Sequence, residues 1–150
     1  MDYLPLFHNL KGRNILVIGG GEIALRKVRL VQEASAIITI VAKDFCPDLL
    51  EMDARDKEHG CNGLILITAG YEHHHMLDLP NIVMVIAATN DRDLNRLVSE
   101  HAQAANILTN VVDDPKFSTV IFPSIVDRSP IQIAISSGGD APVLVRLLRT

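Results

Sequence analysis

Short apolar runs alternate with amphipathic segments between residues 14 and 112. Runs rich in Val, Ile and Leu predict buried strands at 14–18, 36–42, 64–68, 82–89 and 107–112. The spacing of apolar residues predicts helices at 22–34 and 91–105, and the more polar stretch 44–59 fits a helix or a loop followed by a helix. Strands that alternate with helices are typical of βαβ units, which build a mostly parallel sheet.

Two of the predicted helices carry apolar positions that we expect to pack on the sheet. In the helix at 22–34 they are Ile23, Val28, Leu30 and Val31. In the helix at 91–105 they are Leu94, Leu97, Val98 and Ala102. Helices that connect parallel strands cover both faces of the sheet, so we expect an α/β fold of that kind.

The pattern changes after Pro115. Two β-rich runs, 119–127 and 131–137, are separated by the turn signal RSP and predict a hairpin at an edge of the sheet or at a dimer contact. An apolar edge left uncovered invites pairing with another chain. We therefore expect a homodimer held in part by residues 117–136, which include Val120, Ile121, Phe122, Ile125 and Val126.

The last ten residues, APVLVRLLRT, have helical spacing. Their apolar stripe consists of Val143, Leu144, Leu147 and Leu148. The stretch stops at Thr150 without a C-capping glycine, which predicts a helix that is cut short and a chain that is a fragment. We expect residues 1–116 to form the main α/β domain, and 117–150 to form the β extension and the start of a dimerisation or helical region.

The composition argues against several classes of protein. The 150 residues are 48% hydrophobic and 21% charged, with a formal net charge of −4, which describes a soluble globular chain with a real core. A mildly acidic balance disfavours nucleic-acid binding, and no apolar run approaches the roughly 20 residues that span a bilayer. Cys46 and Cys61 match neither a CxxC pair nor a disulfide framework, and no signal-peptide pattern opens the chain, so we expect a reducing cytoplasm.

A glycine-rich turn follows the first predicted strand. Gly19, Gly21 and Ala24 fit the G-x-G-x-x-G/A fingerprint of dinucleotide-binding folds. The first position allows a tight turn, the second lets the backbone approach a pyrophosphate, and the third allows close contact between helix and strand. The next helix would offer free N–H groups to the phosphates at Glu22 and Ile23. The alternative is a glycine turn used only for packing.

The end of the second predicted strand bears on the choice of dinucleotide. An acid there binds the ribose hydroxyls in NAD-binding folds. Ala42 occupies the nearest position, and Lys43 and Asp44 follow. Asp44 favours NAD, whereas Lys43 could tolerate the 2′-phosphate of NADP, so the sequence leans modestly toward NAD.

Polar residues follow the fourth and fifth predicted strands. Thr89 and Asn90 could hydrogen-bond the nicotinamide side of the cofactor, or Asn90 or Asp91 could cap the next helix. The sequence NVVDDP at 110–115 has the composition of a turn. A turn is the favoured interpretation of this stretch alone, and an acid that moves protons is the alternative.

Two further motifs each allow a binding role and a purely structural role. SSGGDAP could hold a substrate carboxylate through Ser136 and Ser137, or it could be a loop with Asp140 as N-cap and Pro142 in the first helical turn. The triplet His73–His75 could suggest a metal site, but adjacent side chains diverge along a helix or strand. We expect a solvated loop there.

Several motifs together resemble the N-terminal module of the siroheme synthase family, the precorrin-2 dehydrogenase and sirohydrochlorin ferrochelatase family. In chain order they are MDYLPLF, VIGGGEIALRK, IAATND, NVVDDPK, FPSIVDRSPIQIAISSGG and APVLVRLLR. The resemblance runs over nearly all of the chain, and residues 60–80 match least well. It implies a Rossmann-like NAD-binding domain, followed in the family by a dimerisation segment, a helical domain and often a uroporphyrinogen methyltransferase.

The resemblance also implies two activities. NAD⁺ would take a hydride from precorrin-2 to give sirohydrochlorin, and Fe²⁺ would then be inserted to give siroheme. Asp113 corresponds to the family's aspartate that serves both reactions, as proton acceptor and as transient metal ligand. Asn110, Ser136 and Ser137 would contact the tetrapyrrole, and Asp114 would be a solvated turn residue. Co²⁺ makes similar demands on a carboxylate, so the metal stays open.

Two alternatives remain from the sequence. The chain could be an NAD-sensing regulatory module, which needs the glycine turn but no acid after the fifth strand. It could also be a dimerising cofactor domain whose activity requires further residues.

Overall fold

The computed structural model describes residues 1–138 and 142–149. The chain divides into two compact units. The larger unit is His8–Thr119, and the smaller unit combines Met1–Phe7 with Val120–Thr150.

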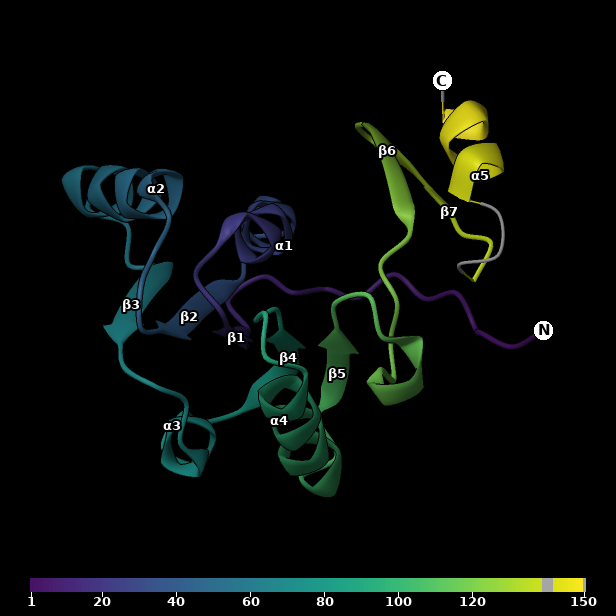
Figure 1. Ribbon diagram of the computed structural model, residues 1–150. Helices are drawn as coiled ribbons and strands as arrows, with labels where there is room; N and C mark the ends of the chain where they lie inside the picture. Colours follow the sequence, from purple (N-terminus) through teal and green to yellow (C-terminus); the bar gives the residue numbers. More distant parts are fainter. Residues whose placement is uncertain (139–141, 150) are drawn as a thin grey trace. The chain divides into compact units, whose positions relative to one another are not determined.

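The larger unit is built on a parallel sheet of five strands in the order β3-β2-β1-β4-β5 (Figure 1). Every pair of neighbouring strands runs parallel. The strands are β1 (Asn14–Ile18), β2 (Ile37–Ala42), β3 (Leu64–Thr68), β4 (Ile82–Ala87) and β5 (Leu108–Val111). The predicted parallel sheet of about five strands is therefore confirmed.

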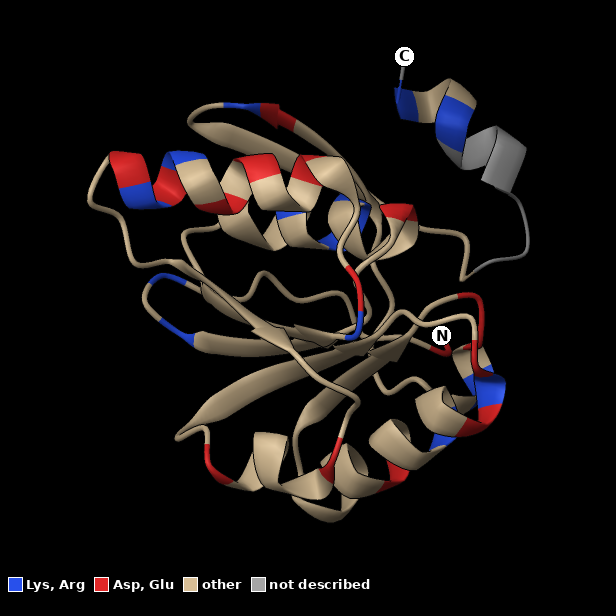
Figure 2. Ribbon diagram, turned by 60° about the vertical axis from the view of Figure 1, so that its left-hand side comes forward, with Lys and Arg blue, Asp and Glu red and all other residues tan. Residues whose placement is uncertain are grey.

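Helices cover both faces of this sheet, with α1 and α2 on one side and α3 and α4 on the other (Figures 1 and 2). The helices are α1 (Glu22–Glu33), α2 (Pro47–Glu58), α3 (His73–Leu77) and α4 (Arg92–Ala104), and a 3₁₀ turn, η1 (Pro115–Phe117), follows β5. Charged residues lie on the helices and loops, whereas the five strands are made of uncharged residues (Figure 2). The expected Rossmann-like α/β fold is confirmed.

The core lies where the central strands meet the inner faces of the helices. Ile15, Leu16 and Val17 in β1 are fully buried because this strand lies mid-sheet under helices on both faces. Val28 and Val31 of α1 are buried as predicted, whereas Ile23 is 41% exposed in the first turn of the helix.

Helix α4 is turned relative to the predicted stripe. Leu97 is 43% exposed, although we expected it to pack on the sheet. Asn95 and Ser99 are buried instead, beside Val98 and Ala102. These two polar residues occupy the buried face because they have hydrogen-bond partners there.

The prediction of a loop at His73–His75 is wrong, because these residues begin the short helix α3. Glu72 and His75 form a reciprocal capping box, in which the Glu72 N–H donates to Nδ1 of His75 at 2.9 Å. Met76 is 4% exposed and anchors the helix in the core. A histidine in place of the usual Glu or Gln hid this cap from the sequence.

The smaller unit contains an antiparallel hairpin of β6 (Ser124–Arg128) and β7 (Ile131–Ile135), followed by α5 (Pro142–Arg149). The predicted hairpin is confirmed, but it forms a sheet of its own and is not an edge of the parallel sheet. The expected cap at Asp140 and the side chains of Pro142, Val143 and Leu144 lie outside what the structure describes. No helix in the described part of the chain is long and apolar enough to cross a membrane.

Candidate cofactor and substrate site

The loops that leave β2, β1, β4 and β5 follow one another along one edge of the sheet, because these strands are neighbours in that order. The strand order reverses direction between β1 and β4. In open α/β sheets, ligands bind in the crevice at such a switch point, outside the carboxyl ends of the strands. The candidate site therefore runs from Asp44, through Gly21 and Thr89, to Asp113.

The turn after β1 fits tightly between its two neighbours. Gly19 has φ +126°, and a Cβ atom there would overlap the carbonyl oxygen of Ala88, which follows β4. A Cβ atom on Gly20 would overlap the carbonyl oxygen of Asp44, which follows β2. The Gly20 carbonyl also accepts a hydrogen bond from the Cys46 N–H at 2.7 Å. Gly20 stands at a variable position of the fingerprint, so its packing role had no sequence signal.

Gly21 is a glycine for a different reason. Its φ of −90° is open to any residue. Leaving aside its neighbours in the chain, no heavy atom of the described residues would lie within 4 Å of an added Cβ. Within the described structure no side chain caps α1. The first-turn residues Glu22 and Ile23 are exposed. Open space thus lies before uncapped N–H groups, which fits a pyrophosphate that needs close approach to the backbone.

Lys43 and Asp44 lie in the exposed loop after β2, beside the glycine turn. The backbone of Asp44 packs against Gly20. The Cε atom of Lys43 lies 3.3 Å from the position of a Cβ on Gly70, so the lysine stem extends toward the loop after β3. Lys43 and Asp44, which bear on the choice between NAD and NADP, therefore lie at the end of the site that is next to the glycine turn.

Thr89 follows β4 and is tied to helix α4. Its hydroxyl donates to Oδ1 of Asn95 at 2.6 Å and accepts from the Asp91 N–H at 3.2 Å. Asp91, and not Asn90, caps α4, because its Oδ1 accepts from the N–H groups of Asp93 and Leu94. The capping alternative for this segment thus holds at Asp91, while Thr89 follows the carboxyl end of β4 and bonds to Asn95 of α4.

Asp113 is the first residue after the sheet bonding of β5 ends. The Val112 N–H donates to the Ala87 carbonyl at 3.0 Å, and the Asp114 N–H closes a turn onto the Val111 carbonyl at 3.2 Å. Asp113 has φ +58°, a conformation that aspartate tolerates better than most residues, and it is exposed. The prediction of a turn within NVVDDP is confirmed. The acid stands at the carboxyl end of the strand, open to solvent.

Lys27 on α1 is a charged neighbour of this acid that sequence reasoning missed. Burial lowers the pKa of the Lys27 ammonium group, and the charge of Asp113 raises that pKa in part, so the two groups are close enough to interact. A signal was present in the sequence, because Lys27 shares the inward face of α1 with Ala24 and Val31, both buried.

Comparison with known proteins identifies the family that carries this arrangement. Residues 6–124 match the family described as putative NAD(P)-binding. The chain belongs to this NAD(P)-binding family. The match includes all of the larger unit and therefore the whole edge from Asp44 to Asp113. Residues 128–150 match a second family, described as sirohaem biosynthesis protein central.

Similar curated proteins are siroheme synthases. The siroheme synthase of Stutzerimonas stutzeri (strain A1501) is 52% identical over 149 residues, which cover 99% of this chain and 30% of that protein. The siroheme synthase of Azotobacter vinelandii (strain DJ / ATCC BAA-1303) is 51% identical over the same length and share of each chain. The chain spans about 30% of the length of these relatives. The expected resemblance to siroheme synthases is confirmed.

A solved structure described as SirC, precorrin-2 dehydrogenase, superposes with a TM-score of 0.77 at 26% identity. The match covers 98% of this chain and 68% of that one. The X-ray structure of Pen from Bacillus thuringiensis, at 13% identity and a TM-score of 0.51, shares the fold alone. The architecture is thus that of the NAD(P)-binding family.

The structure brings only some of the expected substrate residues into this NAD(P)-binding unit. Asn110 is 6% exposed in β5, paired in register with Ile86 of β4, close in sequence to Asp113. Ser136 and Ser137 belong to the smaller unit. There the Ser136 hydroxyl accepts a hydrogen bond from the Gly138 N–H at 3.1 Å.

The histidines of α3 have structural contacts. The ring of His73 stacks on His101 of α4, with centroids 3.8 Å apart and planes 15° from parallel. His75 is part of the helix cap, as described above. Within the residues that the structure describes, no group of three or more His, Cys, Asp or Glu side chains could hold a metal ion.

Proposed function

We propose that this chain is the NAD⁺-dependent dehydrogenase part of siroheme biosynthesis and oxidises precorrin-2 to sirohydrochlorin. Two kinds of likeness support the proposal: siroheme synthases about half identical in sequence, and the fold of a precorrin-2 dehydrogenase. The observation that carries it is the position of Asp113, an exposed carboxylate on the same edge as the open glycine turn.

The proposed reaction removes two electrons and two protons from precorrin-2. NAD⁺ held at Gly21 and the first turn of α1 would supply the acceptor for a hydride, that is, for one of the protons with both electrons. Asp113 accepts the second proton, which it passes to solvent because its side chain is exposed. The charge of Asp113 favours the protonated form of Lys27 on α1 and so raises the pKa of Lys27 in part. The products are sirohydrochlorin, NADH and H⁺.

The cofactor would lie along the edge of the sheet. Its pyrophosphate would approach Gly21 and the N–H groups of Glu22 and Ile23. Asp44 would bind the ribose hydroxyls, which favours NAD over NADP, with Lys43 beside it. The nicotinamide would reach the turn at Thr89, between the glycine turn on β1 and Asp113 on β5.

A second reaction at the same carboxylate would insert Fe²⁺ into sirohydrochlorin. Two pyrrole protons leave as the metal enters, so a nearby base assists, and a carboxylate also binds a divalent cation transiently. Asp113 would perform both tasks, with Fe²⁺ as substrate. Asn110, Ser136 and Ser137 would contact the tetrapyrrole.

Two kinds of protein partner complete the proposal. Residues 117–136 would hold a homodimer. A uroporphyrinogen methyltransferase, fused or separate, would supply precorrin-2.

A cofactor-binding module without catalysis is the second candidate. It requires only the open glycine turn before the uncapped N–H groups of α1, and no acid after β5. Incubation of the chain with precorrin-2 and NAD⁺ separates the two candidates. The dehydrogenase produces NADH absorbance in proportion to added precorrin-2. A module without catalysis binds NAD⁺ in a calorimeter and produces none.

A further inference from the structure

Helix α4 carries three polar residues on one side, each four positions from the next: Asn95, Ser99 and Gln103. Residues spaced by four lie one above another on the same face of a helix. Asn95 is 6% exposed and Ser99 1% exposed, and Gln103 continues the line toward the helix end. Burying polar groups is costly without hydrogen bonds, so the partners of these side chains explain their presence.

Asn95 holds the turn after β4. Its Oδ1 atom accepts from the Thr89 N–H at 3.2 Å and from the Thr89 hydroxyl at 2.6 Å. Its Nδ2 atom donates to the Thr89 carbonyl at 3.0 Å. One side chain therefore satisfies the backbone donor, the backbone acceptor and the hydroxyl of Thr89.

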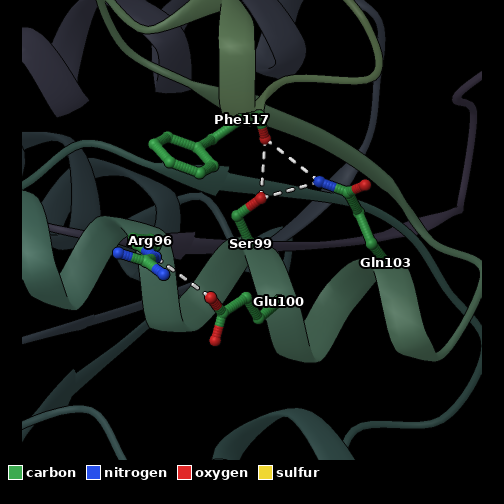
Figure 3. A network of polar contacts seen from close by, with 5 residues as sticks. All are labelled: Arg96, Ser99, Glu100, Gln103 and Phe117. Carbon is green, nitrogen blue, oxygen red and sulfur yellow. Dashed lines mark hydrogen bonds and ion pairs between the residues drawn. The ribbon is translucent and has the colours of Figure 1, made fainter.

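Ser99 and Gln103 hold the segment after Asp113 (Figure 3). The Ser99 hydroxyl donates to the Phe117 carbonyl at 2.6 Å. Nε2 of Gln103 donates to the Ser99 hydroxyl at 2.8 Å and to the same Phe117 carbonyl at 3.3 Å. The Arg96 guanidinium lies 5.8 Å from the centroid of the Phe117 ring. Phe117 is thereby fixed to α4 through both its backbone and its side chain.

Residues 112–118 form a loop closed at its base on β5. The Val111 N–H donates to the Ser118 hydroxyl at 2.8 Å, and that hydroxyl donates to the Asp114 carbonyl at 2.9 Å. The Thr119 N–H donates to the Thr109 carbonyl at 2.8 Å. Asp113 therefore sits in a short loop tied to β5 at its base and to α4 through Phe117.

We propose that Asn95, Ser99 and Gln103 are positioning residues, which set the distance between the cofactor turn at Thr89 and the acid at Asp113. The inference rests on the proposed dehydrogenase. Apolar residues in place of the buried Asn95 and Ser99 would pack α4 on the sheet without the cost of buried polar groups. Because the polar residues bond to the backbone of two different loops, they make one helix the common support of both.

The test compares variants of the 150-residue chain in NADH formation from precorrin-2, with NAD⁺ affinity measured separately by calorimetry. Ser99→Ala removes the donor to Phe117 and leaves the Thr89 turn in place. A small displacement of a catalytic group lowers the rate of the chemical step, by up to about 100-fold per ångström. We expect kcat to fall on the order of tenfold or more, with KM for NAD⁺ and its dissociation constant unchanged.

Glu100→Gln is the matched control. Glu100 neighbours Ser99 on α4 and accepts a hydrogen bond from Nε of Arg96 at 3.1 Å (Figure 3), and a glutamine oxygen can keep that bond and so the place of Arg96 beside Phe117. This variant should keep kcat. Gln103→Met serves if Ser99→Ala does not fold, since Gln103 is exposed, and it should lower kcat by a few-fold. A folded Ser99→Ala or Gln103→Met variant with unchanged kcat overturns the inference. If the unaltered chain forms no NADH, the proposed function itself fails, and this inference fails with it.

Discussion

Asp113 at the end of β5 raises the pKa of Lys27 on α1. The two residues are distant in sequence, and the parallel sheet brings them to the same edge. Burial acts in the opposite direction and lowers the pKa of Lys27 more strongly than Asp113 raises it. A half-buried amine and an exposed carboxylate therefore share the end of the site where we place the tetrapyrrole.

Asp113→Asn should lower the pKa of Lys27 further. The change removes the negative charge that favours the protonated amine, while the burial that disfavours it remains. An NMR titration of the Lys27 side chain in the unaltered chain and the variant measures this directly. Asp114→Asn is the control and should leave the titration where it was. An unchanged or raised Lys27 pKa in Asp113→Asn would show that the two charges do not interact.

Gly21→Asp should abolish most NAD⁺ binding in a folded protein. The structure leaves room for a side chain at this position, so the variant can fold, but its carboxylate would occupy the place of the pyrophosphate. Repulsion at close contact should cost binding at least a few kcal/mol. Calorimetric titration with NAD⁺ is the measurement, and Gly21→Ala, which adds only a methyl group, should lose less. Equal affinity in Gly21→Asp and the unaltered chain would place the cofactor elsewhere.

Gly20→Ala should destabilise the fold even though position 20 is variable in the glycine fingerprint. A Cβ there would overlap the carbonyl oxygen of Asp44 and lie 2.9 Å from Cβ of Ala42. Forcing an extra carbon into a filled space typically costs about 1–3 kcal/mol. Denaturant unfolding should show this loss, whereas Gly21→Ala should stay within about 1 kcal/mol of the unaltered chain. Equal stability of the two variants would contradict the close packing of the loop on Gly20.

His101 should make the larger unit less stable in mild acid. Burial and then the stacked ring of His73 lower the pKa of His101, and Glu100 raises it in part. Because the folded pKa lies below the unfolded one, the unfolded chain takes up the proton first as the pH falls below about 6.5. The stabilising contribution is present above that pH and is lost as the pH falls toward the folded pKa.

Unfolding free energies between about pH 8 and pH 5 test this contribution of His101. His101→Gln should lose less stability over that range than the unaltered chain. His8→Gln, at an exposed position of the N-terminal segment, should behave like the unaltered chain. An identical acid loss in His101→Gln would assign the pH dependence to other groups.

The sequence predicted those features whose causes are local. The strands were found because apolar runs such as Asn14–Ile18 are short, rich in β-branched residues and bounded by glycines. The glycine turn and the acid after β5 followed from their place at strand ends. Capping of α4 at Asp91 was one of the predicted alternatives, because a single Asp or Asn before a helix indicates an N-cap.

Features that depend on partners distant in sequence were missed. Lys27 gains its role from Asp113, and Ser99 from Phe117, and no local pattern connects either pair. The apolar spacing of α4 predicts that Leu97 packs on the sheet. In the structure Leu97 is exposed and the polar Asn95 is buried. The grouping of Met1–Phe7 with the C-terminal unit likewise has no local signal.

The central claim is that Asp113 accepts the proton in an NAD⁺-dependent oxidation of precorrin-2. The most direct measurement is the rate of NADH formation from precorrin-2 at saturating NAD⁺, compared for the unaltered chain, Asp113→Ala and Asp114→Ala. General base assistance is worth about 10²- to 10⁴-fold, so Asp113→Ala should lose that much rate while keeping its NAD⁺ affinity. Asp114→Ala should stay near the unaltered rate, since the Asp114 side chain makes no cap bond to η1 in the described structure. Full activity in Asp113→Ala, a dead Asp114→Ala, or no NADH from the unaltered chain would contradict the account.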